Sequence, residues 1–160
     1  MKRVYLGNKE LTTIATVTNG GGGGDDTKKW VDYFNGTLTE FTVPEGVTKI
    51  RNCAFYACSS LTGITIPDSV TKIGDSAFYD CSNLTGITIP DGVTSIDYGA
   101  FYNSYNLRDM TVKATTPPTL GNNALPYELK TIYVPASSVD AYKAASGWSS
   151  FADKIQAIPT

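Results

Sequence analysis

A repeat of 23 residues fills the middle of the chain and constrains its fold more than any other sequence feature. Residues 61–83 read LTGITIPDSVTKIGDSAFYDCSN and residues 84–106 read LTGITIPDGVTSIDYGAFYNSYN, with 15 of 23 positions identical. Residues 38–60 share 13 of 23 positions with residues 61–83. Degenerate copies begin at Leu107, where the pattern returns one residue late at residues 120–125, and at Leu129. A fixed period of this length is typical of units that stack to bury a continuous core.

Each copy predicts two short extended segments separated by a turn. In L-x-x-I-x-I-P, Ile64 and Ile66 flank a threonine, which is the alternation of a strand with one buried face. Proline ends that strand, and the following Asp-Ser or Asp-Gly supplies turn chemistry. The next segment places Val70 and Ile73 inward, and Phe78 of A-F-Y fills the interior. Equivalent residues of neighbouring coils are expected to form ladders with the spacing of adjacent strands, about 4.8 Å.

The motif L-x-x-I-x-I-P-x-x-V-x-x-I-G-x-x-A-F resembles the BspA-like leucine-rich repeats, from Leu38 to the C-terminus. The resemblance implies a solenoid that is usually exposed at a surface and used for attachment, with no catalytic residues and no cofactor. We therefore expect a mostly β fold with short helical caps, a right-handed leucine-rich-repeat solenoid of about four to five coils.

The remaining segments are predicted to flank this solenoid. Residues 1–24 predict a β-arm, with two strands around Gly7-Asn8, and a flexible joint at the five glycines of residues 20–24. Residues 25–37 predict an N-terminal cap, residues 38–134 the solenoid, and residues 135–160 a C-terminal capping helix and strand. That helix is expected over Pro135–Gly147, with Ser137 or Ser138 as its N-cap and Gly147 at its C-terminal end.

Composition excludes several classes of function. The chain has no histidine, so neither Ser-His-Asp nor Cys-His catalysis nor a histidine-ligated metal site is available. A net charge of −2 gives no basic footprint for nucleic acid. The glycine run is not followed by Gly-Lys-Ser/Thr, so it is interpreted as a linker and not as a phosphate loop. No signal peptide is visible, and no stretch approaches the ~20 apolar residues needed for membrane insertion.

Two ladders of potentially reactive side chains have simpler structural explanations. Glu45, Asp68 and Asp91 occupy the same turn position in successive copies, where they make the turn or, alternatively, hold calcium. Cys58 and Cys81 are in register, and free buried thiols are favoured over a disulfide. No metal site and no cofactor are therefore expected.

Two outward ladders are the candidate binding surfaces. Tyrosine offers a large contact area with a polar tip, and it is enriched at interfaces and paratopes. The favoured candidates are Tyr56, Tyr79 and Tyr102, joined by Tyr98 and Tyr105. Threonine is a common exposed strand residue, so its ladder is the weaker candidate. It comprises Thr42, Thr65, Thr88 and Thr111.

These features predict a non-catalytic attachment module for a protein or glycan ligand on a cell or mucosal surface. The order of arm, glycine joint and solenoid also resembles accessory or tail-associated proteins of bacteriophages. The first hypothesis is therefore a virion component, tail or surface decoration, whose arm docks on a larger assembly or on another copy of the chain. The alternative is a bacterial cell-surface adhesin, and a glycan-active enzyme is the least favoured. The expected location is a virion or an extracellular surface.

Overall fold

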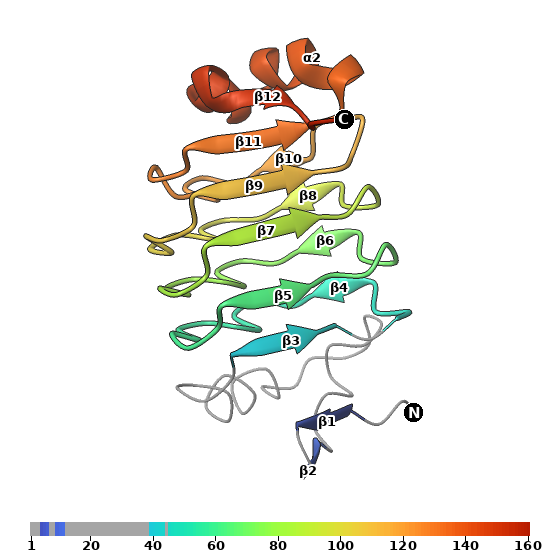
Figure 1. Cartoon of the computed structure of the whole chain (residues 1–160), viewed down its shortest axis with the longest axis vertical. Helices are drawn as coiled ribbons and strands as arrows, with labels where there is room; N and C mark the ends of the chain where they lie inside the picture. The colour runs from blue at the N-terminus through green and yellow to red at the C-terminus, as the bar shows by residue number, and fades with distance from the viewer. Residues whose placement is uncertain (1–3, 7–8, 12–38, 44) are drawn as a thin grey trace.

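The computed structural model describes residues 4–6, 9–11, 39–43 and 45–160. In Figure 1 the repeat region is a stack of short strands, one coil above another, with helical segments at the C-terminal end. The fold is mostly β, because each 23-residue copy contributes two short extended segments and very little helix.

The first strand of each repeat lies in a series that we call the strand face, on the near side of Figure 1. Its strands pair in parallel: β3 with β5, β7 with β9, β9 with β11 and β11 with β12. Strands β5 and β7 lie side by side, and among the described residues no ladder joins them. The bounds are β3 Glu40–Thr42, β5 Gly63–Thr65, β7 Gly86–Ile89, β9 Asp109–Val112, β11 Thr131–Val134 and β12 Ile155–Ala157.

The second extended segment of each repeat forms a separate parallel sheet in the order β10-β8-β6-β4. Lys49 pairs with Lys72 and Lys72 with Ser95, so the 23-residue period of the sequence is the register of the sheet. Thr119 pairs with Ser95, one residue beyond that period, as the late return of the fourth copy predicts. The bounds are β4 Lys49–Ile50, β6 Lys72–Ile73, β8 Ser95–Ile96 and β10 Thr119–Leu120.

The core lies between the two series of strands and contains the predicted inward ladders. Phe78 stacks between Phe55 and Phe101, with ring centroids 5.1 and 5.0 Å apart and interplanar angles of 2° and 4°. This spacing matches that of neighbouring strands, so one apolar ring per coil fills the interior without a gap. Two further sets of equivalent residues are buried: the leucine that begins each copy and the valine or isoleucine that ends its first strand segment. They are Leu61, Leu84, Leu107, Val43, Ile66, Ile89 and Val112.

The turns between coils repeat a left-handed backbone conformation that the sequence analysis did not identify. Cys53, Ser76 and Gly99 occupy equivalent positions and have φ of 58°, 52° and 59°. Only glycine adopts this region without a steric penalty. Cys53 therefore stands at a position of special backbone geometry.

The C-terminal helix is shorter than predicted. A 3-10 turn, η2 (Ala136–Ser138), leads into α2 (Val139–Ala144), which ends at Ala145 in an extended conformation. Ser138 is the N-cap residue but makes no side-chain capping bond, and Gly147 instead starts the 3-10 segment η3 (Trp148–Lys154). The prediction of one helix over Pro135–Gly147 is therefore wrong. After the helix ends, the chain buries Trp148, whose Nε1 donates to the Pro118 carbonyl of the fourth coil.

The first described residues of the chain form a short hairpin. β1 (Val4–Leu6) and β2 (Lys9–Leu11) pair antiparallel, with Leu6 opposite Lys9, as the expected hairpin requires. The glycine joint at residues 20–24, the cap at residues 25–37 and Leu38 lie outside the described residues. Within the described ranges, no helix is both long and apolar enough to span a bilayer.

Candidate binding surface

The strand face presents two rows of outward side chains, because alternate residues of a strand point to opposite sides. In one row Thr42 is in register with Thr65, and Thr88 with Thr111. Tyr133 of β11 continues that row beside Thr111. The two pairs, with β5 and β7 side by side between them, place the predicted threonine ladder on a single surface.

The second row has an acidic side chain at each end and two glycines between them. Glu40 is in register with Gly63, and Gly86 with Asp109. The space above the two glycines is open, since a Cβ at Gly63 meets only Glu40 Cγ at 3.9 Å, and one at Gly86 only the Asp109 carbonyl oxygen at 3.6 Å. Glycine inside a strand often marks a place where another molecule approaches the backbone closely. The row thus leaves a hollow at the two glycines, with Glu40 in the coil before it and Asp109 in the coil after it.

Together the two rows form an open groove of about 780 Å³ along the strand face, which we call the strand-face groove. Among the described residues, its lining includes both carboxylates, both glycines, the four threonines and Tyr133, and no lysine or arginine. Hydroxyl groups donate and accept hydrogen bonds whereas carboxylates only accept them. The groove therefore suits an extended ligand rich in hydroxyl or amide groups and lacking negative charge.

The tyrosine ladder lies on a different surface, and its rings pack on one another. Tyr56 and Tyr79 stack with centroids 4.7 Å apart at 3°, and Tyr102 follows at 5.7 Å and 34°. Asn103 Nδ2 donates to the Tyr79 hydroxyl oxygen at 3.0 Å, and the Tyr105 hydroxyl donates to Asn103 Oδ1 at 2.9 Å. Because these ring faces are already in contact with neighbouring rings, the ladder presents mainly ring edges and hydroxyls to a ligand.

The predicted site residues thus divide between two surfaces. Thr42, Thr65 and Thr88 line the strand-face groove, while none of the five tyrosines does. Sequence reasoning did not single out Glu40, Gly63, Gly86, Asp109 or Tyr133. The available signal was the third position of each copy, which reads Glu, Gly, Gly and Asp between otherwise similar strand residues.

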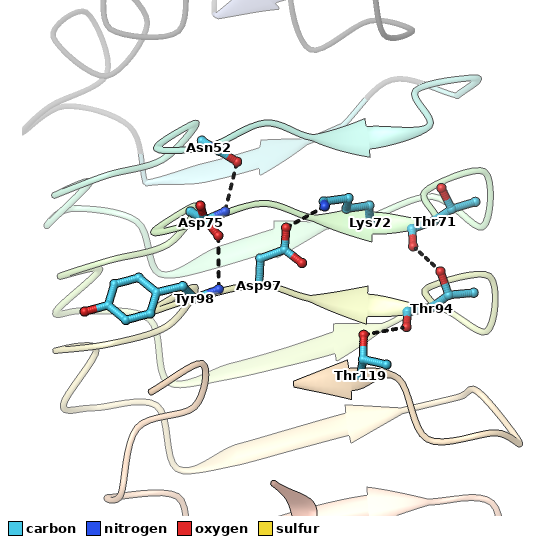
Figure 2. A network of polar contacts seen from close by, with 8 residues as sticks. All are labelled: Asn52, Thr71, Lys72, Asp75, Thr94, Asp97, Tyr98 and Thr119. Atoms are coloured by element: carbon cyan, nitrogen blue, oxygen red, sulfur yellow. Dashed lines mark hydrogen bonds and ion pairs between the residues drawn. The ribbon is translucent and has the colours of Figure 1, made fainter. Parts of the chain in front are cut away.

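The second sheet carries polar contacts that join one coil to the next, as Figure 2 shows. Asn52 Oδ1 accepts from the Asp75 backbone N–H at 3.0 Å, and Asp75 Oδ1 accepts from the Tyr98 N–H at 3.1 Å, each one repeat further along. Lys72 Nζ lies 2.6 Å from Asp97 Oδ2, and this hydrogen bond raises the pKa of Lys72. A partly exposed pair of this kind contributes at most about 1 kcal/mol. These side chains therefore hold neighbouring coils of the stack together.

The three cysteines are free thiols. Burial raises the pKa of Cys58 to about 12, and burial and the adjacent Cys58 thiol raise the pKa of Cys81. Burial and the Asp75 carboxylate raise the pKa of the half-buried Cys53. A thiol reacts as its thiolate, so all three are poor nucleophiles at neutral pH.

Thiol labelling checks this arrangement. In the native protein at neutral pH, Ellman's reagent is expected to react slowly with Cys53 and not with Cys58 or Cys81, whereas all three react after urea unfolding. A Cys53→Ser variant that shows no native reaction is the matched control. Rapid native reaction of two thiols contradicts the described core.

Glu45, Asp68 and Asp91 are exposed in their turns. In the described part of the chain, no three histidine, cysteine or acidic residues lie close enough to hold a metal ion.

A 23-residue unit that gives one parallel strand to each of two stacked series defines a leucine-rich-repeat protein. Residues 32–145 match the family described as BspA type Leucine rich repeat region, in six copies, so the chain belongs to that family. The match begins ahead of Leu38 and includes one copy more than the five that begin at Leu38, Leu61, Leu84, Leu107 and Leu129.

Solved structures include similar chains. A leucine-rich repeat protein from Bacteroides ovatus is 26% identical with a TM-score of 0.54, over 76% of this chain and 30% of that one. A leucine rich cell surface protein from Faecalibacterium prausnitzii is 18% identical with a TM-score of 0.28, over 64% of this chain and 55% of that one. The chain therefore spans about a third of the first protein and about half of the second. No match was found among curated proteins.

Proposed function

We propose that the chain is a non-catalytic binding module that attaches through the strand-face groove to a protein or glycan on a cell or mucosal surface. BspA-type repeats are generally binding scaffolds without catalysis, which supports the module itself. The proposal takes the stack as a right-handed solenoid of about four to five coils, the architecture that the repeat predicts.

The observation that carries the proposal is the glycine hollow between Glu40 and Asp109, beside a continuous row of threonines. The strands are parallel and in register, so each coil offers the same hydroxyl group one strand spacing further along. An extended ligand lying across the strands meets one such group per coil, and the open space above the glycines admits it close to the backbone.

Filling the hollow tests this proposal. Gly86→Trp places a large side chain in the groove at a position where its Cβ has room, and an aromatic residue is favourable in a strand. Attachment to a glycan array and to a mucin-coated surface is expected to fall about 30-fold or more, the effect of losing a binding hot spot. The circular dichroism spectrum and the melting temperature should not change.

The matched control is the double variant Tyr79→Ala, Tyr102→Ala, which truncates the tyrosine ladder and leaves the groove intact. It is expected to attach as well as the parent chain. Loss of attachment in this variant together with full attachment by Gly86→Trp reverses the assignment in favour of the tyrosines. Failure of the parent chain to attach to either surface contradicts the proposed function.

The setting of this attachment is a further part of the proposal. A short hairpin, β1–β2, precedes the five glycines of the sequence, an order that suits an arm docking on a virion or other larger assembly. The alternative setting is a bacterial cell-surface adhesin. Tail, lysis or portal genes beside the coding sequence support the virion, whereas a sortase or secretion cassette there supports the adhesin.

A further inference from the structure

The fourth repeat departs from the 23-residue period beside the C-terminal cap. Thr119 pairs with Ser95 one residue beyond the period, and Thr131 pairs with Asp109 one residue short of it. The connection from β10 to β11 is therefore two residues shorter than the one from β8 to β9. In the fourth coil Leu125 and Pro126 follow Ala124, where Phe101 and Tyr102 follow Ala100 in the coil before, so smaller side chains stand at this edge and leave room there.

A pocket of about 260 Å³ occupies this room, between residues 120–127 of the fourth coil and residues 146–151 of the cap. Gly147 makes the close approach of the cap possible, because its φ is +80° and a Cβ there would lie 3.0 Å from Leu120 Cβ. The pocket is below the ~300–1,000 Å³ typical of sites for drug-sized ligands, so it suits one small ring and not an extended chain.

An aromatic ring stands at the side of this pocket. Tyr127 is 69% exposed, more than any other large hydrophobic side chain in the described residues. Its ring lies 6.4 Å from that of Phe151 at 24°, and Lys154 Nζ donates to its backbone carbonyl at 2.9 Å. The backbone at Tyr127 is thus anchored to the cap, which holds an exposed ring in a defined place.

The polar lining of the pocket is neutral and without partners. Asn122, Asn123, Ser146 and Ser150 line it, and none of these side chains makes a hydrogen bond to another described residue. No charged residue of the described part of the chain lines it. Amides and hydroxyls offer both donors and acceptors, as the hydroxyl groups of a sugar require, and the aromatic ring offers an apolar face.

We propose that this pocket binds a single neutral sugar ring, as a second site separate from the strand-face groove. The ring packs against Tyr127, and the amides of Asn122 and Asn123 bind its hydroxyls. The two sites differ in chemistry, because the groove is lined by two carboxylates and this pocket by none.

The test is a titration of the ¹⁵N-labelled full chain with free galactose, mannose, fucose and N-acetylglucosamine, followed by amide chemical shifts. At least one sugar is expected to shift the amide signals of residues 121–127 and 146–151. Tyr127→Ala is expected to weaken that binding about tenfold, since it removes the aromatic contact. Asn123→Gly keeps the left-handed backbone (φ 54°) and removes one amide, so it should weaken binding without unfolding the coil.

Two controls make the outcome decisive. Tyr56→Ala removes another exposed tyrosine, three coils away along the stack, and should leave the titration unchanged. Gly86→Trp should also leave it unchanged, which separates this site from the strand-face groove. The proposal is overturned if none of the four sugars shifts these signals, or if the shifts persist with equal affinity in Tyr127→Ala.

Discussion

Replacing Phe78 by alanine is expected to destabilise the protein by about 3–5 kcal/mol, the range for removing a buried aromatic ring from a core. Phe78 is fully buried, and its ring lies between those of Phe55 and Phe101 with both faces covered. Ala77 and Cys81 are also fully buried in the packed core, so they have little freedom to move into the cavity that the missing ring leaves.

The loss is expected to spread along the stack, because each coil is stabilised mainly by its neighbours. A domain of this size has a total stability of only about 5–15 kcal/mol. Urea unfolding followed by circular dichroism measures the change. Tyr79→Ala is the matched control: it removes the adjacent ring from the parallel but half-exposed tyrosine stack, and should cost about 1 kcal/mol. Equal losses in the two variants contradict the assignment of Phe78 to the core.

Trp148→Ala is expected to release the C-terminal cap and to destabilise the protein by about 3–5 kcal/mol. Trp148 is fully buried, its ring packs edge-on against Tyr142 at 5.0 Å, and its Nε1 donates to the Pro118 carbonyl at 2.7 Å. Alanine removes the packing and also leaves a buried carbonyl without its donor.

The consequence reaches beyond the cap, because the cap covers the last coil of the stack and an uncovered end exposes apolar core. Size-exclusion chromatography is expected to show association of Trp148→Ala, and thermal unfolding a lower midpoint. Tyr142→Phe is the milder comparison, since it deletes only the hydroxyl that donates to the Ala114 carbonyl at 2.7 Å. A monomeric Trp148→Ala protein with unchanged stability contradicts this role of the cap.

Much of the strand face follows from the sequence, and the candidate site only partly does. The alternation in each copy predicts that Thr42, Thr65 and Thr88 point outward, and their placement in one groove follows from the register of the repeats. The alternation does not show that the tyrosine rings cover one another, because ring orientation depends on the side chains above and below. The favoured ladder and the groove therefore lie on different surfaces.

The 23-residue period is enough to predict the stack of coils, the register of its strands and the residues of its core. Equivalent residues of neighbouring copies contact one another, so the repeat itself predicts these contacts. Contacts between segments of different sequence cannot be predicted in this way. The early end of α2, the turn at Gly147 and the pocket beside Tyr127 arise where the cap packs on a shortened fourth coil. These features depend on the shape of two surfaces that are brought together only when the chain has folded.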